Sequence, residues 1–293
     1  MKKWLLSFVS LIFIMSLVAC SQGEKISNSS NKEVFNIGMI PDQNVSDINR
    51  SMDDFASYLS KKTGLKVKFV PVVDYSALVT GFERGEIQLA WFGGLTGVQA
   101  RNVVPGSEAI AQRPTDEKFE SVFIKQKGLR INSLADLKGY SFTFGSESST
   151  SGHLMPRYFL MEAGINADKD FKGKPNYSGS HDTTYKLVES GAYQTGALNI
   201  SVWEAAVKEG KVDTNKIEVF YTTPPYYDYN WTINNVDDKY GKGTKDKVQQ
   251  TILSMTSNDS EMMKLLNTDS FIETNNDNYK DIEKVAKQLG IIK

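Results

Sequence analysis

The sequence predicts an α/β protein with two lobes, each built on a mostly parallel sheet flanked by helices. Three observations support this fold class. From Val34 onward, short apolar runs alternate with segments of helical periodicity, which is the rhythm of strand–helix–strand units. Two such stretches of similar size follow each other, and neither is complete in one pass of the chain. The length of 293 residues suits two lobes of roughly 100–150 residues each.

The first stretch contains three predicted strands separated by two predicted helices. The longer helix has Ser46 as its predicted N-cap, carries apolar side chains at three- and four-residue spacing, and stops at Gly64. Parallel strands joined in this way need right-handed crossovers, so helices are expected on both faces of the sheet. The predicted strands are Val34–Ile40, Val67–Val70 and Ile87–Trp91, and the predicted helices are the one between Ser46 and Gly64 and a second over Tyr75–Arg84.

The second stretch repeats the alternation, and the chain is predicted to cross between the lobes near Arg113–Phe119 and Tyr221–Tyr227. The first lobe then comprises residues 34–115 and a return segment, 223–293, that ends in C-terminal helices. The second lobe comprises residues 116–222. Its predicted strands are Ser121–Lys125, Tyr140–Phe144, Lys174–Ser178, Thr195–Leu198 and Ile217–Tyr221.

Residues 1–19 are predicted to be a signal peptide. Two lysines precede an apolar run that ends at Met15 and is shorter than the ~20 residues needed to span a bilayer. The run leads to Cys20, and the surrounding Leu-Val-Ala-Cys resembles a bacterial lipobox, which implies lipidation of Cys20. A plain signal peptide followed by a chance cysteine is the alternative. The polar segment 20–33 is predicted to be a flexible tether.

Composition excludes several classes of function. Lys and Arg number 34 against 35 Asp and Glu, so the chain lacks the basic excess that holds nucleic acid. A single cysteine forbids an internal disulfide, and two histidines leave little for a histidine-based metal site. We therefore expect no nucleic-acid partner, no metal and no cofactor.

The segment Gly145–Gly152 is the main candidate binding element. It reads Gly-Ser-Glu-Ser-Ser-Thr-Ser-Gly and lies between a predicted strand and helix, at the carboxyl end of the sheet where open α/β folds bind ligands. Hydroxyls and the free N–H groups of a helix start bind an anion without lysine or arginine. A serine-rich N-cap in a surface loop has the same composition. The candidate ligand-binding residues are Ser149, Thr150, Ser151 and Gly152.

A second predicted helix start contributes an imidazole. His181 follows Gly179 and Ser180, and it can donate to an oxyanion beside the serine-rich segment. A lone histidine is more often a structural donor or a solvated side chain. The other histidine, His153, is predicted to lie on a helix surface.

Aromatic side chains occupy the other candidate positions. Trp91 and Phe92 end a predicted strand before two glycines, where they either line a cleft or complete the core. Tyr226 belongs to an aromatic segment with two prolines at the predicted return crossing, so it is expected at a hinge and cleft edge.

Taken in order, these segments closely resemble the substrate-binding proteins of ABC importers for phosphate, phosphite and phosphonate. The resemblance runs from about Val34 to Trp231, and it implies a type II periplasmic-binding-protein fold that closes on a small oxyanion. It also implies that the Ser-Thr-Ser and histidine positions donate to the ligand, namely Ser149, Thr150, Ser151 and His181. The segments that carry it are Leu89–Gly94, Ser149–Gly152 with Pro156, and Gly179–Asp182.

The identity of the oxyanion is left open. The family usually has Tyr-Phe-Gly-Pro where this chain has Trp91-Phe92-Gly93-Gly94, and Val98–Arg101 with Val104–Gln112 resembles a branch labelled selenate importers. A fully ionised dianion needs only donors, whereas a protonated phosphonate also needs an acceptor. The candidate acceptors are Asp42, Asp182 and Asp228.

We therefore predict a monomeric, lipid-anchored binding protein on the extracytoplasmic face of the membrane, which delivers the oxyanion to an ABC permease and its ATPase. A tethered solute sensor of the same fold is an alternative that the sequence does not separate. A secreted serine hydrolase would need a Gly-x-Ser-x-Gly nucleophile elbow, and no such pentapeptide occurs. We predict that the protein is not an enzyme.

Overall fold

Two β-sheets organise residues 33–293, the part of the chain that the computed structural model describes. The first has the strand order β11-β4-β10-β3-β1-β2 and the second β7-β6-β8-β5-β9, so the chain leaves the first sheet after β4 and returns after β9. The first sheet contains β1 (Val34–Met39), β2 (Lys66–Phe69), β3 (Leu89–Phe92), β4 (Glu108–Gln112), β10 (Asn230–Ile233) and β11 (Ile272–Glu273). The second contains β5 (Ser121–Gln126), β6 (Phe142–Phe144), β7 (Asn176–Tyr177), β8 (Thr195–Asn199) and β9 (Ile217–Thr222).

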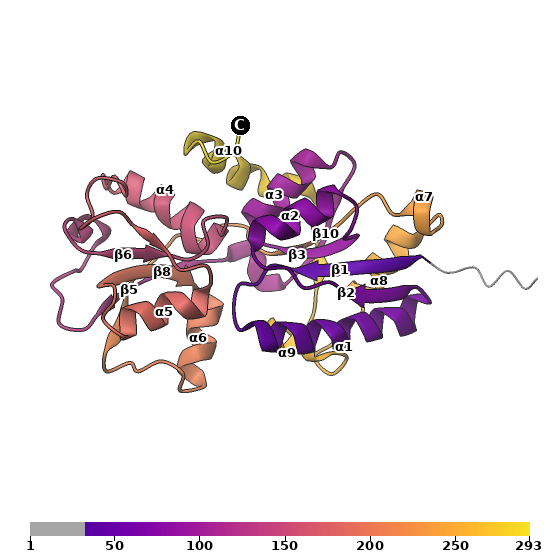
Figure 1. Ribbon diagram of the computed structural model, residues 1–293, viewed down its shortest axis with the longest axis horizontal. Helices are drawn as coiled ribbons and strands as arrows, with labels where there is room; N and C mark the ends of the chain where they lie inside the picture. The colour runs from indigo at the N-terminus through magenta and orange to yellow at the C-terminus, as the bar shows by residue number, and fades with distance from the viewer. Residues whose placement is uncertain (1–32) are drawn as a thin grey trace, which may run out of the picture. The chain divides into compact units, whose positions relative to one another are not determined.

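Helices flank both sheets, which confirms the predicted two-lobed α/β fold class (Figure 1). In the first lobe, α1 (Val45–Thr63) covers one face of the sheet, and α2 (Tyr75–Glu83) and α3 (Gly94–Val103) cover the other. In the second lobe, α4 (Met155–Glu162) lies opposite α5 (His181–Glu189) and α6 (Ile200–Lys208). The return segment adds α7 (Asp237–Tyr240), α8 (Thr244–Leu253), α9 (Glu261–Leu265) and α10 (Lys280–Gln288).

The predicted signal peptide, nearly all of the predicted tether, and Cys20 lie outside the described residues. Within residues 33–293, no helix has both the length and the apolar character needed to cross a bilayer.

Each sheet is mixed, whereas the sequence predicted mostly parallel sheets. β1 pairs in parallel with β2 and β3, but β10 runs antiparallel to both β3 and β4. In the second sheet, β5 runs antiparallel to β8 and β9. β5 and β10 are the strands that follow the two crossings between the sheets. Because the chain reaches them from the other lobe rather than through a crossover helix, nothing forces them to run parallel to their neighbours.

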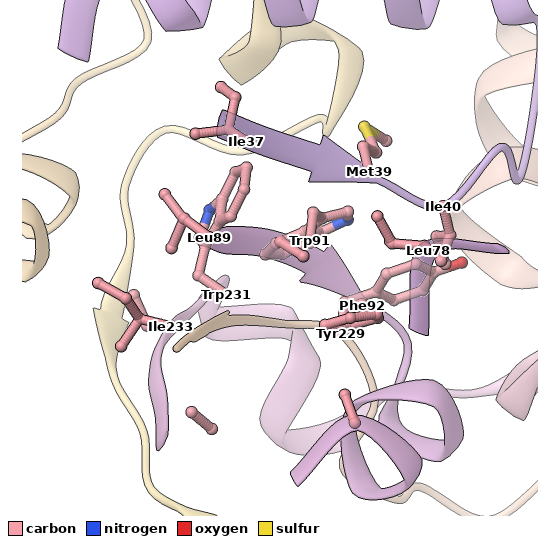
Figure 2. Close-up of a cluster of buried hydrophobic side chains, with 14 of the residues drawn as sticks. Ile37, Met39, Ile40, Leu78, Leu89, Trp91, Phe92, Tyr229, Trp231 and Ile233 are labelled. Atoms are coloured by element: carbon pink, nitrogen blue, oxygen red, sulfur yellow. The ribbon is translucent and has the colours of Figure 1, made fainter. Parts of the chain in front are cut away.

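The core of the first lobe joins the sheet to the return crossing. Figure 2 shows side chains of β1, β3 and β10 gathered around Trp91. The ring of Trp91 lies 5.2 Å from that of Trp231 and stacks on Tyr229 at 5.6 Å, with an interplanar angle of 17°. All three side chains are buried. Offset stacking of large rings adds to the apolar area that they bury, so this cluster holds the crossing firmly against β3.

The start of α1 differs from the prediction by two residues. Asn44, rather than Ser46, is the N-cap, since its side-chain oxygen accepts from the backbone N–H groups of Ser46 and Asp47 at 3.0 and 3.2 Å. Gly64 ends the helix with a φ of 72°, as predicted, in the left-handed region that favours glycine. The segment between β1 and this cap carries Asp42 to the edge of the first lobe.

Candidate functional site

The Ser/Thr loop, residues 145–152, connects β6 to α4 through a π-helical turn, η3 (Thr150–Leu154). The backbone N–H of Leu154 donates to the carbonyl of Ser149, five residues earlier, at 3.0 Å. The Oγ of Ser149 accepts from the N–H of Gly152 at 2.9 Å, which leaves its own O–H available as a donor. π turns are rare in proteins overall, and those that do occur are often found at functional sites.

The second half of the Ser/Thr loop, Ser149–Gly152, is buried at the junction of the two lobes, while Glu147 in its first half is exposed. Ser149, Thr150 and Ser151 each expose 2% or less of their surface. The Oγ1 of Thr150 accepts from the N–H of Leu95, at the start of α3 in the first lobe, at 2.9 Å. The carbonyl of Ser151 accepts from the Oγ of Ser121 at 2.7 Å. Burial of four consecutive hydroxyl or glycine positions is costly unless they have polar partners, so this placement favours the binding interpretation.

Two glycines allow His181 to approach the Ser/Thr loop. The N–H of Gly145 donates to the carbonyl of Gly152 at 2.8 Å, which closes the loop on itself. A Cβ atom on Gly152 would lie 3.0 Å from the Cα of Gly145 and 3.0 Å from the Cε1 of His181. The imidazole therefore packs directly against the loop backbone, at a distance that only glycine permits.

His181 is a neutral donor with a defined tautomer. Its Nδ1 accepts from the backbone N–H of Asn199 at 3.4 Å, so the proton is on Nε2, which lies 3.4 Å from the hydroxyl of Tyr229. Burial lowers the pKa of His181 to about 4, so the ring is uncharged at neutral pH. Its backbone N–H donates to the carbonyl of Asp42 at 2.9 Å, a second direct contact between the lobes.

Tyr229, which the sequence analysis did not single out, links the two lobes at this point. Its hydroxyl donates to the Oδ2 of Asp42 at 2.9 Å and accepts from the Nδ2 of Asn199 at 2.8 Å. Asp42 follows β1 in the first lobe, Asn199 ends β8 in the second, and Tyr229 lies on the return crossing. A tyrosine in an aromatic crossing segment was visible in the sequence, but its two partners are far away along the chain.

Two of the three candidate acceptor carboxylates are buried here. Asp228 accepts from the N–H of Gly94 at 2.8 Å through Oδ1, while its Oδ2 has no partner in the structure. Asp42 likewise has an unpartnered oxygen, Oδ1. Burial raises the pKa of Asp42 to about 6 and that of Asp228 to about 7, although nearby Arg113 favours the ionised form of both.

The third candidate, Asp182, lines the same cavity as Asp42 but has partners for both of its oxygens. Its two oxygens accept from the Oγ of Ser180 at 2.6 Å and from the Nζ of Lys186 at 2.8 Å, one turn along α5. This is an i,i+4 ion pair in which the lysine side chain is 57% exposed and the carboxylate 18% exposed.

The predicted aromatic residues have separate places. Trp91 is fully buried, and its Nε1 has no partner. Phe92 packs edge-on against Phe82 at 5.5 Å and belongs to the core, which was the alternative interpretation. The hydroxyl of Tyr226 lies 2.6 Å from the Oγ of Ser121, whose own hydrogen is used by the Ser/Thr loop. Tyr226 therefore supports the loop from behind.

Tyr75 is a further residue that the sequence analysis missed. It begins α2 and is buried, with a hydroxyl that has no partner in the hydrogen-bond network, although it lies near Ser149 and Asp42. Asp74 caps this helix. A tyrosine directly after a capping aspartate was therefore the only feature of the sequence that could have pointed to Tyr75 as a candidate site residue. Within residues 33–293, the buried polar atoms without partners include four from this region: Asp42 Oδ1, Tyr75 Oη, Trp91 Nε1 and Asp228 Oδ2.

Arg113 places one buried positive charge beside these carboxylates. Its guanidinium forms a two-pronged pair with Asp116, at 2.8 and 2.7 Å, and donates to the carbonyl of Leu266 at 2.8 Å. It also lies 4.9 Å from the ring centre of Tyr229 and 5.5 Å from that of Trp91. Three of its five N–H groups are used by these partners, and Arg113 lines the adjoining cavity, so it contributes a positive field and two further N–H groups there.

A cavity of about 1020 Å³ adjoins this network. Its lining includes Asp42, Trp91, Asn199 and Tyr229, together with charged side chains of both lobes. Among the described residues, no group of three or more His, Cys, Asp or Glu side chains is arranged to hold a metal ion. The chemistry that the site offers is therefore hydroxyl, imidazole and backbone donors opposite two carboxylates that also accept hydrogen bonds.

Comparisons with known proteins agree on one family. Residues 37–279 match the model of the family described as "ABC transporter, phosphonate, periplasmic substrate-binding protein". The "Probable ABC transporter phosphite binding protein PhnD1" of Prochlorococcus marinus is 42% identical over 90% of this chain and 92% of its own length. The "Phosphate-import protein PhnD" of Mycolicibacterium smegmatis is 28% identical over 69% of this chain and 68% of its own length.

Solved structures show the same fold. PhnD1 of Prochlorococcus marinus in complex with methylphosphonate has a TM-score of 0.85 at 42% identity, covering 89% of this chain and 100% of that chain. A binding protein component of an ABC phosphonate transporter from Pseudomonas aeruginosa has a TM-score of 0.75 at 22% identity, covering 87% and 86%.

Proposed function

The chain belongs to the family of phosphonate periplasmic substrate-binding proteins of ABC transporters, and we propose that it captures a small, protonated tetrahedral oxyanion of the phosphite or methylphosphonate type. The ligand would lie between the lobes, where the hydroxyls of Ser149, Thr150 and Ser151 donate to it, with Gly152 and His181 beside them and their N–H groups directed at Ser149 and Tyr229. Trp91 would form the apolar wall, and Tyr75 would add a donor from the first lobe.

The observation that carries this proposal is the pair of buried carboxylates beside the donors. Asp42 and Asp228 each keep one buried oxygen without a protein partner. A carboxylate can accept the proton of a P–OH group, and because the second pKa of phosphoryl groups is about 6, a fraction of such a ligand still carries that proton near neutral pH. Selenate and sulfate hold no proton at that pH, so they have nothing to donate to Asp42 or Asp228, and the ionised form of either carboxylate would repel them. The buried carboxylates therefore favour phosphorus oxyanions as ligands. The selenate-type ligand suggested by the sequence stays an untested prediction.

The relatives support the same ligand class. The protein that is 42% identical to this chain is named for phosphite, and its similar structure is a complex with methylphosphonate. The geometry also favours binding over hydrolysis, because the Nε2–H of His181 faces Tyr229 and not a serine that it could activate.

We further propose that the protein works as a monomer, tethered through lipid on Cys20, and passes its ligand to an ABC permease and its ATPase. The signal-like residues 1–19 and the lipobox-like sequence support the tether. The lobes would comprise residues 34–115 with 223–293, and residues 116–222. The alternative, a tethered sensor of the same fold, differs only in its partner: a signalling protein, and not a permease, would bind the ligand-closed form. Fractionation of bacterial cells that express the full chain tests the anchor. We expect the wild-type protein in the membrane fraction and the Cys20→Ala variant in the soluble fraction.

Isothermal titration of the purified protein with phosphite, methylphosphonate, phosphate, sulfate and selenate tests the ligand class. We expect the phosphorus oxyanions to bind at least about tenfold more tightly than sulfate and selenate. Ser149→Ala should weaken that binding about tenfold or more, since hydrogen bonds to charged acceptors contribute roughly 1.5–3 kcal/mol. Ser148→Ala, one residue earlier and only half-buried, is the matched control and should change little. Equal or tighter binding of selenate would overturn the proposal.

A further inference from the structure

We propose that His153 is a positioning residue for ligand binding, which holds the exposed part of the Ser/Thr loop through a hydrogen bond to the carbonyl of Glu147. The sequence analysis placed His153 on a helix surface, and this was wrong, since the side chain is only 3% exposed. The inference rests on the proposed function, because it assigns His153 a role in presenting the donors of that site.

Two fixed partners determine the tautomer of His153. Its Nδ1 lies 2.6 Å from the carbonyl oxygen of Glu147, which can only accept, so Nδ1 carries the proton. Its Nε2 lies 2.9 Å from the Nε of Arg157, which can only donate, so Nε2 is the acceptor. Each ring nitrogen therefore has one defined role. Burial lowers the pKa of His153 to about 4, which keeps the ring neutral.

The other side of the imidazole is anchored to the second lobe. Arg157 on α4 pairs with both oxygens of Asp168, at 2.9 and 3.2 Å, and donates to the hydroxyl of Tyr177 on β7 at 3.0 Å. The ring of His153 packs edge-on against Phe144, the last residue of β6, with the ring centres 4.9 Å apart. The imidazole is thus fixed to two strands and a helix before it reaches the loop.

The imidazole of His153 contacts the exposed part of the loop at the carbonyl of Glu147. The other hydrogen bonds of this segment are mainly among its own residues. Glu147 is exposed, and its neighbours are connected mainly to one another: the N–H of Ser149 donates to the carbonyl of Ser146, and the N–H of Ser148 to the Oγ of Ser146. Ser149 follows directly and caps the π turn. Movement of the Glu147 peptide would therefore shift the hydroxyl of Ser149 away from the ligand while leaving the core of the lobe intact.

Two substitutions separate the roles of the two ring nitrogens. His153→Asn places an amide nitrogen near the position of Nδ1 and keeps the donor to Glu147. His153→Gln places an amide oxygen near the position of Nε2 and keeps the acceptor for Arg157, but loses the donor to the loop. We expect His153→Asn to bind methylphosphonate and phosphite within about threefold of the wild type, and His153→Gln to bind them about tenfold or more weakly.

Thermal melts of both variants provide the structural control. A merely structural role predicts that affinity follows stability, whichever nitrogen is replaced. Wild-type affinity in His153→Gln, or equal losses in both variants that follow their melting temperatures, would overturn the inference. If the wild-type protein binds none of the oxyanions, the proposed function fails and this inference fails with it. If the wild type binds them and both variants match it, only this inference fails.

Discussion

At the scale of single residues, the site is dominated by buried carboxylates whose ionisation is linked to folding. Asp228 is 1% exposed, and burial raises its pKa from 3.8 to about 7. Between these values the folded state holds a proton that the unfolded state has released. Stability therefore falls as pH rises from about 4 to about 7, because the unfolded state binds fewer protons in this window. This is the reverse of the usual behaviour of an ion-paired aspartate.

Asp228→Asn should remove this pH dependence. The amide oxygen can still accept from the N–H of Gly94, and the amide has no charge to bury. We expect the variant to match the wild type near pH 4.5 and to exceed its free energy of unfolding at pH 8 by up to about 4 kcal/mol, since one pKa unit corresponds to about 1.36 kcal/mol. Urea denaturation at pH 4.5, 6 and 8 measures the difference. Parallel stability curves would show that Asp228 does not titrate in this window.

At the scale of elements, the π turn after β6 is the part that brings the donors together. Its geometry depends on Gly152, whose N–H is capped by Ser149 and whose carbonyl accepts from Gly145. The start of α3 does not offer free N–H groups to a ligand. The N–H groups of Gly94 and Leu95 donate to Asp228 and Thr150. The helix thus orients side chains of the site instead of offering its own N-terminus to an anion.

Gly152→Ala should damage the turn and the site together. The new methyl group would lie 3.0 Å from the Cα of Gly145, the Cε1 of His181 and the Oγ of Ser149, and at least the first of these cannot move without the backbone. We expect a loss of roughly 1–3 kcal/mol of stability and at least about tenfold weaker binding of methylphosphonate.

Gly81→Ala is the matched control for this substitution. In α2, the new methyl group would lie 3.1 Å from Cδ1 of Ile87, the mobile end of a side chain. It should leave ligand binding unchanged in the same titration. Equal affinities for Gly152→Ala and the wild type would contradict the importance of the turn.

At the scale of the whole molecule, two crossing segments, the packing of Leu154 and Met155 into the core of the first lobe, and a few polar contacts connect the lobes. The crossings pair with each other, as Phe119 and Tyr226 exchange backbone hydrogen bonds of 2.8 and 2.9 Å. Nearer the site, the hydroxyl of Tyr229 joins Asp42 of the first lobe to Asn199 of the second. Contacts that exist only when two lobes meet stabilise the closed form, so a small number of hydrogen bonds controls its population.

Tyr229→Phe should shift the protein toward a more open form. The substitution keeps the ring stacked on Trp91 but leaves Asp42 and Asn199 without their shared partner, which costs roughly 1–3 kcal/mol for buried polar groups. We expect a larger radius of gyration in small-angle scattering with methylphosphonate present, and weaker binding. Tyr226→Phe is the control for the radius alone, since that hydroxyl bonds to Ser121 of the second lobe, next to the same crossing. Equal radii for all three proteins would contradict the role of Tyr229.

Much of the fold and part of the candidate site could be predicted because the signals are local. Helical and strand periodicity, the glycine stop at Gly64 and the serine-rich segment after β6 are all patterns within a few residues, and they predicted the two-lobed α/β class and a strand-to-helix connection at the Ser/Thr loop. The N-cap of α1 was misplaced by two residues because Asn44 and Ser46 are both good caps and only backbone geometry distinguishes them.

The sequence by itself determined the α/β class, the family and the donor-rich loop, because propensities and short motifs depend on neighbours along the chain. Only the tertiary structure decided that both sheets are mixed, that Asp42 and Asp228 are buried with one unpartnered oxygen each while Asp182 pairs with Lys186, and that Tyr75, Tyr229 and His153 are buried near the Ser/Thr loop or its partners. These outcomes depend on burial and on partners as far apart as Asp42 and Tyr229, separated by 187 positions. Such proximity arises from the packing of two lobes, and no local pattern encodes it.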